Sequence, residues 1–156
     1  MRKVLAAALT TGLIAAAVVA GAQGSSTAPT LMRPDGRPVP WQGWLEEHGP
    51  AAVLVWASWA PRSADVLAGV GRLEAVSRRL GLELVLVDVQ EPIDDARSAL
   101  AGVEVRWLHD RHGAILRHHR VIRVPWLVVV AADGSVTGST APSSEALARW
   151  HEGRGE

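Results

Sequence analysis

Two predominantly apolar segments with an amphipathic helical pattern between them constrain the fold of this chain most. Residues 52–59 and 82–89 are apolar at nearly every position, as expected of central strands that are covered on both faces. Between them, residues 63–80 place an apolar side chain every three to four positions, and Gly81 follows as a helix stop. Two parallel strands joined by a helix require a right-handed crossover. The sequence therefore predicts a β-α-β unit at the centre of an α/β fold.

The segments on either side of this unit complete a mixed sheet. Asp-Gly dipeptides at 35–36 and 133–134 are strong hairpin signals. The first predicts a hairpin over residues 31–40, and the second pairs 126–131 with 136–139. The other predicted elements are short helices at 41–47, 91–101 and 114–120, an extended piece at 103–108, and a last helix at 143–151. This order predicts a thioredoxin-like fold, with a central mixed β-sheet flanked by helices and an N-terminal β-hairpin.

The turn between the first central strand and the long helix carries a specific motif. From Val55 to Ser63 it reads Val-Trp-Ala-Ser-Trp-Ala-Pro-Arg-Ser. This resembles the active-site segment of the TlpA/ResA-like branch of the thioredoxin superfamily, roughly Phe-Trp-Ala-Thr/Ser-Trp-Cys-Pro-x-Cys. The resemblance covers about residues 31–150, and its second landmark is Val124-Pro125, which is similar to the family's Gly-Val-Pro-Thr segment. In that family the proline is cis and faces the active-site turn, so the resemblance implies a cis bond before Pro125.

Both catalytic cysteines of that family are missing here. Their positions align with Ala60 and Ser63, and the chain contains no cysteine. Disulfide exchange proceeds by thiolate attack, so these degenerate positions supply no catalytic residue, and we expect no cofactor. The carboxylates that tune the thiols in relatives align with Leu54 and Val66, so the proton-handling groups are missing too. We expect Ser63 to cap the helix N-terminus, because no neighbouring residue supplies a base for a serine nucleophile.

The peptide-binding groove of the redox relatives does not depend on sulfur. In those relatives, peptides pair with the backbone before the cis-proline, a form of strand addition. The resemblance places the corresponding binding positions at Trp59, Pro61, Arg62, Val124 and Pro125. These residues are interpreted either as a retained site for a protein or peptide or as residues that only preserve the turn and the core.

A cluster of histidines suggests a weaker alternative, a metal carrier. His109, His112, His118 and His119 lie within eleven residues, and imidazole is a common metal ligand. However, His109 and His112 bracket a predicted turn, and adjacent His118 and His119 point to different faces of a helix. We therefore expect no metal site. His119 aligns with a position where relatives carry a tyrosine, so we expect it to pack in the core.

The N-terminus has the pattern of an export signal. Arg2 and Lys3 precede an apolar stretch at 4–20, and residues 20–22 fit a small-x-small cleavage site. The alternatives are cleavage after Ala22 and retention as a membrane anchor, which is the only membrane contact we expect. The predicted divisions are a signal peptide or anchor at 1–22, a linker at 23–30, a thioredoxin-like domain at 31–151 and a tail at 152–156. Export would place the protein in the bacterial periplasm or on the extracytoplasmic face of the inner membrane.

The charge balance gives no indication of nucleic-acid binding. The formal net charge is zero, and without Arg2 and Lys3 the chain has 14 basic and 16 acidic residues. The sequence therefore predicts a non-redox, TlpA-like pseudoenzyme of the cell envelope that binds a protein or peptide partner. The alternatives are a member of a thiol–disulfide oxidoreductase or cytochrome-maturation system, and the histidine metal carrier. The seven tryptophans are interpreted mostly as core residues, and the sequence leaves open an exposed patch of Trp41, Trp44 and Trp150 as a second candidate surface.

Overall fold

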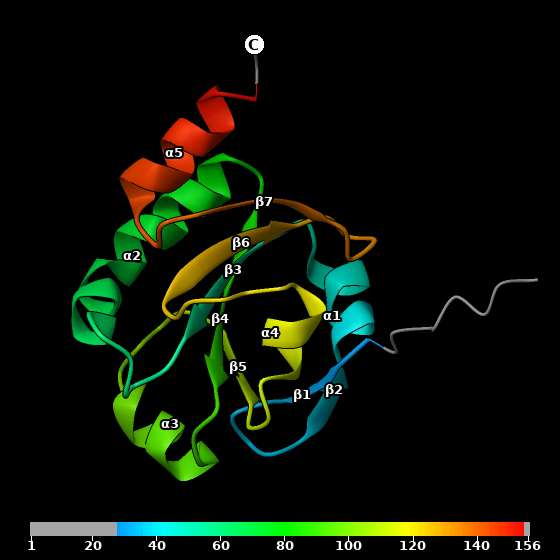
Figure 1. Cartoon of the computed structure of the whole chain (residues 1–156), viewed down its shortest axis with the longest axis vertical. Coiled ribbons are helices and arrows are strands. Elements are labelled where there is room, and N and C mark those ends of the chain that lie inside the picture. The colour runs from blue at the N-terminus through cyan, green and yellow to red at the C-terminus, as the bar shows by residue number, and fades with distance from the viewer. Residues whose placement is uncertain (1–27, 155–156) are drawn as a thin grey trace, which may run out of the picture.

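The computed structural model describes residues 28–154, so the predicted signal peptide or anchor lies outside the described residues. Strands and helices alternate along most of this range (Figure 1). The elements are β1 Thr30–Met32, β2 Pro38–Pro40, α1 Trp41–His48, β3 Ala51–Trp56, α2 Ser63–Arg79, β4 Glu83–Val89, α3 Ile93–Ala99, β5 Trp107–Asp110, α4 Ala114–His118, β6 Trp126–Val130, β7 Val136–Thr140 and α5 Ser144–Glu152. Within 28–154, none of the helices combines the length and apolar character that spanning a membrane requires.

The strands form one mixed sheet in the order β2-β1-β5-β4-β3-β6-β7 (Figure 1). Strands β3, β4 and β5 are parallel, whereas β6 runs antiparallel to β3, and β7 antiparallel to β6. At the other end, β1 pairs antiparallel with both β2 and β5. The predicted β-α-β unit is β3-α2-β4, and both predicted hairpins are present. The thioredoxin-like fold class is therefore confirmed.

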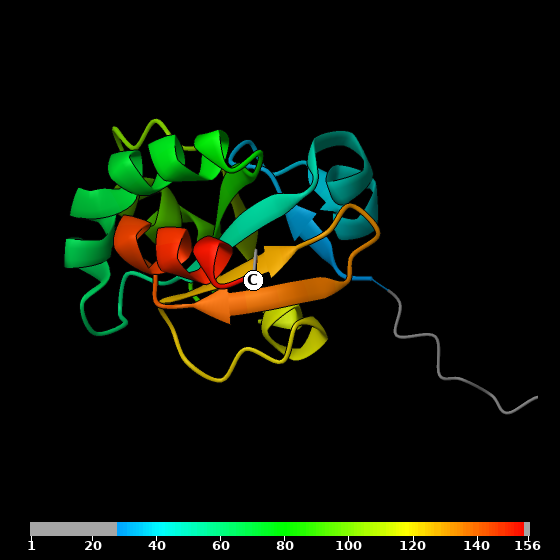
Figure 2. The same ribbon diagram turned by 90° about the horizontal axis from the view of Figure 1, so that it is seen from above.

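Helices cover both faces of this sheet (Figure 2). Because successive strand residues point to opposite faces, β3 contributes to two cores. Val53 and Val55 pack in the cluster that contains residues of α1 and α4. Leu54 and Trp56 pack in the cluster that contains residues of α2 and α5. Burial on both faces explains why the sequence of β3 is apolar without alternation.

Two strand boundaries differ from the sequence-based expectation. β3 ends at Trp56 instead of extending to residue 59, because the Ala57 carbonyl accepts hydrogen bonds from the following turn rather than from a neighbouring strand. β5 occupies Trp107–Asp110 instead of 103–108. Its register sets His109 opposite Asp88 of β4. A search for apolar runs misses a strand that contains buried polar residues such as His109.

An aromatic patch of Trp41, Trp44 and Trp150 does not exist on the surface. Trp41 and Trp44 are 0% and 1% exposed, and their rings stack with centroids 5.3 Å apart. Trp41 Nε1 donates a hydrogen bond to Nε2 of His119 at 2.9 Å. Trp150 is half-buried, and its ring packs closely against Gly138 of β7. The structure therefore favours the core interpretation of Trp41 and Trp44 over the exposed patch, because α1 turns both of its rings toward the sheet.

The contact between Trp150 and Gly138 predicts a sharp steric requirement. A Cβ atom added at Gly138 would lie 2.2 Å from Trp150 Nε1, so the ring would have to move. We expect Gly138→Ala to lower the free energy of unfolding by about 1–3 kcal/mol, the usual cost of overpacking. Chemical denaturation of both proteins measures this difference.

Gly71 in α2 provides the matched control, because nothing lies within 4 Å of an added Cβ there. Gly71→Ala should raise the unfolding free energy by about 0.5–1 kcal/mol, since alanine favours helix more than glycine does. A Gly138→Ala protein as stable as the wild type would show that α5 does not hold Trp150 against β7.

Candidate functional site

The turn between β3 and α2 holds both positions that carry cysteines in the redox relatives. Ala60 is 6% exposed and Ser63 is 3% exposed. The Ser63 N–H donates to the Ala60 carbonyl at 3.3 Å, and Ser63 Oγ donates to the Ala57 carbonyl at 2.5 Å. Ser63 is the first residue of α2, and Arg62 is its N-cap. The capping role expected for Ser63 is therefore wrong, because its hydroxyl bonds backward to the preceding loop.

Arg62 projects from the middle of this turn. Its backbone is left-handed, with φ of 64°, and its side chain is 84% exposed. Its Nε lies 3.9 Å from the carboxylate of Asp65 one turn along α2. Together with Glu145 at the start of α5, these two residues line a shallow cavity of about 140 Å³. The positive charge of Arg62 is thus partly balanced by nearby carboxylates.

The remaining predicted binding residues reach the same end of the sheet. β3 and β6 are antiparallel with Val55 opposite Trp126, so the loop after β3 and the loop before β6 lie side by side. Trp59 is 55% exposed in the first loop. In the second loop, Val124 and Pro125 are half-buried and joined by a cis peptide bond. The sheet therefore brings together the two loops that were predicted to form the groove, and neither loop carries a thiol.

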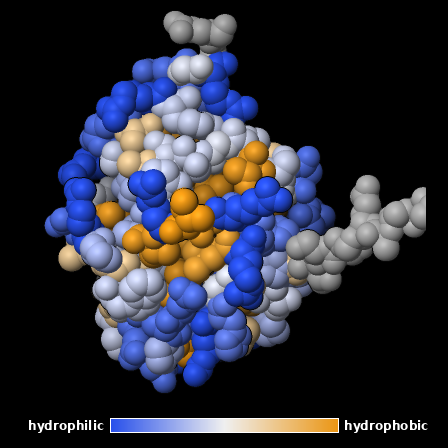
Figure 3. All heavy atoms as spheres, viewed as in Figure 1, coloured by the Kyte–Doolittle hydropathy of each residue, from blue (hydrophilic) through white to orange (hydrophobic). Residues whose placement is uncertain are grey.

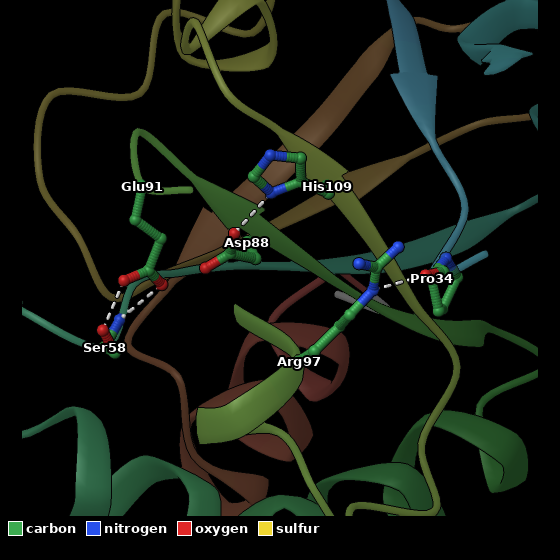
Figure 4. A network of polar contacts seen from close by, with 6 residues as sticks. All are labelled: Pro34, Ser58, Asp88, Glu91, Arg97 and His109. Carbon is green, nitrogen blue, oxygen red and sulfur yellow. Dashed lines mark hydrogen bonds and ion pairs between the residues drawn. The ribbon is translucent and has the colours of Figure 1, made fainter. Parts of the chain in front are cut away.

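A buried polar network at this end of the sheet was not predicted from the sequence (Figure 4). Glu91, just after β4, accepts a hydrogen bond from the Ser58 backbone N–H at 3.0 Å and a second one from the Ser58 hydroxyl. Asp88 near the end of β4 is 0% exposed, and its Oδ2 lies 2.7 Å from Nδ1 of His109 in β5. These two separate contacts bring polar groups of the β3 loop, β4 and β5 to this end of the sheet, and Asp88 Oδ1 has no hydrogen-bond partner among the described residues.

Burial sets the protonation states in this network. Burial, followed by the neighbouring Glu91 carboxyl, raises the pKa of Asp88 to about 9. Burial acts to raise the pKa of Glu91 as well, but interactions with Asp88 and Ser58 outweigh it and lower that pKa. Burial also lowers the pKa of His109, against the opposing effect of the Asp110 and Glu91 carboxylates. At neutral pH, Asp88 is therefore protonated, Glu91 is ionised, and the Asp88–His109 contact joins two neutral groups.

This network corrects the expectation that buried proton-handling groups are absent. Leu54, which aligns with the carboxylate of true thioredoxins, is a buried apolar residue. In the β3–β4 pairing, Leu54 lies opposite Leu86 and Trp56 lies opposite Asp88. The buried carboxyl of Asp88 is therefore on β4 instead of β3, and it lies two residues nearer to the turn that follows β3. The signal in the sequence was an acidic residue inside the apolar run at 82–89. Its partner His109 could not be inferred without the register of β5.

The four clustered histidines lie in different environments. His109 belongs to the polar network, and His119 is 7% exposed with its Nε2 bonded to Trp41. Burial, with a smaller contribution from His118, lowers the pKa of His119 to about 4. The expectation that His119 packs in the core is thus confirmed. Within residues 28–154, no three histidine or acidic side chains are placed to hold a metal ion together.

Several solved structures share this architecture. A secreted Mycobacterium tuberculosis disulfide oxidoreductase homologous to E. coli DsbE is 19% identical, with a TM-score of 0.61 over 83% of this chain and 98% of that chain. MTB dsbF is 18% identical, with a TM-score of 0.64 over 82% and 96%. An exposed lipoprotein thioredoxin of Streptococcus pneumoniae strain TIGR4 is 18% identical, with a TM-score of 0.54 over 80% and 98%.

These similarities define the class of fold. The chain has the thioredoxin-like α/β fold that is found in DsbE-type thiol–disulfide oxidoreductases. No family model matches the chain, and no curated protein matches it in sequence.

The protonated Asp88 predicts a distinctive pH dependence of stability. Its pKa is raised from an ordinary value of 3.8 to about 9 on folding, so its stabilising contribution is lost as the pH rises through 9. The lowered pKa values of His109 and His119 affect stability only below about 6.5. Between pH 6.5 and 9, we expect the unfolding free energy to fall by up to about 1.4 kcal/mol per pH unit.

Denaturation of the Asp88→Asn variant across the same pH range tests this assignment. Asn keeps the shape of the neutral carboxyl and does not titrate, so its stability should stay level from pH 6.5 to 9. Glu104→Gln, which changes an exposed carboxyl, should keep the slope of the wild type. Equal slopes for the wild type and Asp88→Asn would contradict a raised pKa at Asp88.

The turn geometry predicts that a disulfide can be restored. The hydrogen bond from Ser63 N–H to the Ala60 carbonyl closes a turn, and the Cα atoms across such a turn lie within about 7 Å. A disulfide requires a Cα separation of about 4.4–6.8 Å. We expect Ala60→Cys with Ser63→Cys to form this bond under oxidising conditions. With dithiothreitol regenerating its dithiol form, the variant should reduce insulin slowly, because Leu54 and Val66 supply no tuning carboxylate.

Thiol titration before and after oxidation measures bond formation, and insulin turbidity measures turnover. The wild type and the single variant Ala60→Cys are the controls, and both should show only the buffer rate. If the double variant keeps two free thiols under oxidising conditions, the turn does not have the geometry of the redox relatives.

Proposed function

We propose that this chain is a non-redox accessory protein that holds a protein or peptide partner on a thioredoxin-like scaffold in the bacterial cell envelope. One observation carries the proposal. The two loops that form the substrate groove in redox relatives lie together, with Trp59 and Arg62 exposed, while the thiol positions between them hold the buried residues Ala60 and Ser63. The side chains of Trp59 and Arg62 are thus accessible to a partner, whereas the two former thiol positions are covered.

The chemistry of the groove supports binding through the backbone and through two large side chains. The segment before Pro125 leads into β6, and the ring of Trp59 is exposed in the loop that follows the neighbouring strand β3. Aromatic and arginine side chains contribute most to interface energy. Arg62 is flanked by Asp65, so this groove favours a partner segment with polar groups of both signs over a purely acidic one.

An extracytoplasmic location agrees with two independent observations. The N-terminus has a charged start, an apolar stretch and a small-residue cleavage pattern. Two structures with this fold are described as a secreted oxidoreductase and an exposed lipoprotein. A role beside the thiol–disulfide or cytochrome-maturation enzymes of the envelope is consistent with both observations and with the TlpA/ResA-like motif.

Two other functions are disfavoured by specific residues. A direct thiol–disulfide oxidoreductase activity requires a thiolate, and the chain has no cysteine. A histidine metal carrier requires three or four convergent ligands, whereas His109 and His119 are buried and bonded to Asp88 and Trp41 respectively.

Variants in the groove test the proposal directly. A partner is first isolated from the envelope fraction with the immobilised protein and identified, and its affinity is then measured by calorimetry. We expect Trp59→Ala and Arg62→Asn each to weaken binding about tenfold, which corresponds to about 1.4 kcal/mol. Asn is chosen because it tolerates the left-handed backbone at position 62.

The matched control is Arg149→Glu, which changes an exposed arginine on α5. Arg97 is unsuitable as a control, because its Nε donates to the Pro34 carbonyl at 2.9 Å and ties α3 to the β1–β2 hairpin (Figure 4). Circular dichroism confirms that each variant is folded. If the folded variants Trp59→Ala and Arg62→Asn bind the partner as tightly as the wild type, the partner does not occupy the groove.

A further inference from the structure

A second surface lies on the face of the sheet that carries α4. The chain leaves α4 at His118 and crosses the front of the sheet, alongside β6, before entering that strand (Figure 1). Residues of this connection and of β6 and β7 enclose a cavity of about 250 Å³, which we call the α4–β6 pocket. Five of its lining residues define its chemistry, namely Arg120, Ile122, Arg123, Trp126 and Val136.

The rim and wall of the α4–β6 pocket are unusually apolar for a surface. Ile122 is 91% exposed and Val136 is 46% exposed, two of the three large hydrophobic side chains most exposed in residues 28–154. Trp126 forms a half-buried wall between them. Figure 3 shows an apolar band across the middle of this face, interrupted by hydrophilic residues. An exposed apolar patch with a polar rim is typical of an interaction site.

The charged side chains that line the pocket, Arg120 and Arg123, are both basic. The segment from 111 to 123 contains four arginines, three histidines and no carboxylate. In the part of the chain that the structure describes, no carboxylate lies within 4 Å of the guanidinium groups of Arg120 and Arg123. Arg123 instead stacks over the Trp126 ring, with its Cζ 4.4 Å from the ring centroid. These two arginines are therefore available to pair with carboxylates of another molecule.

The size of the pocket indicates what it holds. Small-molecule sites usually have volumes of about 300–1,000 Å³, and this pocket is smaller at about 250 Å³. A single apolar side chain of a peptide is the better match. The pocket begins beside the groove, because Arg123 and Trp126 flank Val124 and Pro125, and it extends along β6 to Val136, which pairs with Val130, four residues from Trp126. At about 3.3 Å per residue, that is about 13 Å from the end of β6 that borders the groove.

We propose that the α4–β6 pocket binds an acidic segment of a partner protein. One apolar side chain of that segment packs between Ile122, Trp126 and Val136. Carboxylates on either side of it pair with Arg120 and Arg123. The described domain is close to neutral, so the concentration of unpaired arginines at this pocket, rather than net charge, provides the selectivity for an acidic segment. The inference does not depend on occupancy of the groove at Trp59 and Arg62.

A synthetic heptapeptide with one leucine between two runs of three alternating glutamate and aspartate residues serves as the probe. Fluorescence anisotropy of the labelled peptide measures its binding to the full-length chain. We expect saturable binding that weakens at least tenfold in the double variant Arg120→Asn with Arg123→Gln, and at least fivefold in Ile122→Ser. Asn is used at position 120 because the backbone there is left-handed, with φ of 54°. Ile122→Ser changes a side chain that makes little contact with the fold.

Three controls establish whether the peptide binds in this pocket and through its leucine. Arg149→Glu and Arg62→Asn should bind the peptide as tightly as the wild type, which distinguishes this pocket from general charge and from the groove. A peptide with glycine in place of leucine should bind at least fivefold more weakly. Equal binding of the two peptides, or unchanged binding in both pocket variants, would overturn the proposal.

Two further outcomes would overturn it in favour of other occupants. Sedimentation could show a dimer of the chain that Ile122→Ser abolishes, which would assign the surface to a second copy. Alternatively, the peptide could fail to bind while vesicles of phosphatidylglycerol retain the wild type but not Ile122→Ser. That result would assign the α4–β6 pocket to a lipid surface.

Discussion

The position of every functional feature in this protein depends on the central strand β3. Each of its residues from Ala51 to Trp56 is buried, and they pair with β4 on one side and with β6 on the other. Because the strand is held along its whole length, the turn that follows it is fixed relative to the loop before β6. The same strand positions Ser58 over Glu91. The turn after β3, its position beside the loop before β6 and the contact between Ser58 and Glu91 therefore all depend on the backbone pairing of β3.

Local patterns in the sequence were sufficient for most of the fold. The continuous apolar strands, the long amphipathic helix and the two Asp-Gly turns predicted the central unit and both hairpins, since these features depend on near neighbours in the chain. Contacts between distant residues were not accessible in this way. The bond between Asp88 and His109 depends on the register of β5, and the burial of Trp41 depends on how α1 packs. Ser63 was misassigned because a hydroxyl at a helix start can bond either forward to the helix or backward to the loop, and only geometry decides.

The two proposed surfaces illustrate why net charge is a poor guide to recognition. The chain is neutral as a whole, yet Arg62 has carboxylates close to it, whereas Arg120 and Arg123 have none within bonding distance among the described residues. The first surface is suited to mixed polar partners and the second to acidic ones. Their chemistry differs because of local pairing, although the same residue type occurs in both places.

The protonated state of Asp88 has a consequence for the folding reaction itself. An unfolded chain in neutral solution carries this carboxylate ionised, whereas the native protein carries it neutral. Completion of the fold is therefore a proton-binding reaction, and its heat in a calorimeter contains the ionisation enthalpy of the buffer that donates the proton. The proton is therefore a reactant in folding, and a mildly acidic solution supplies it more readily than an alkaline one.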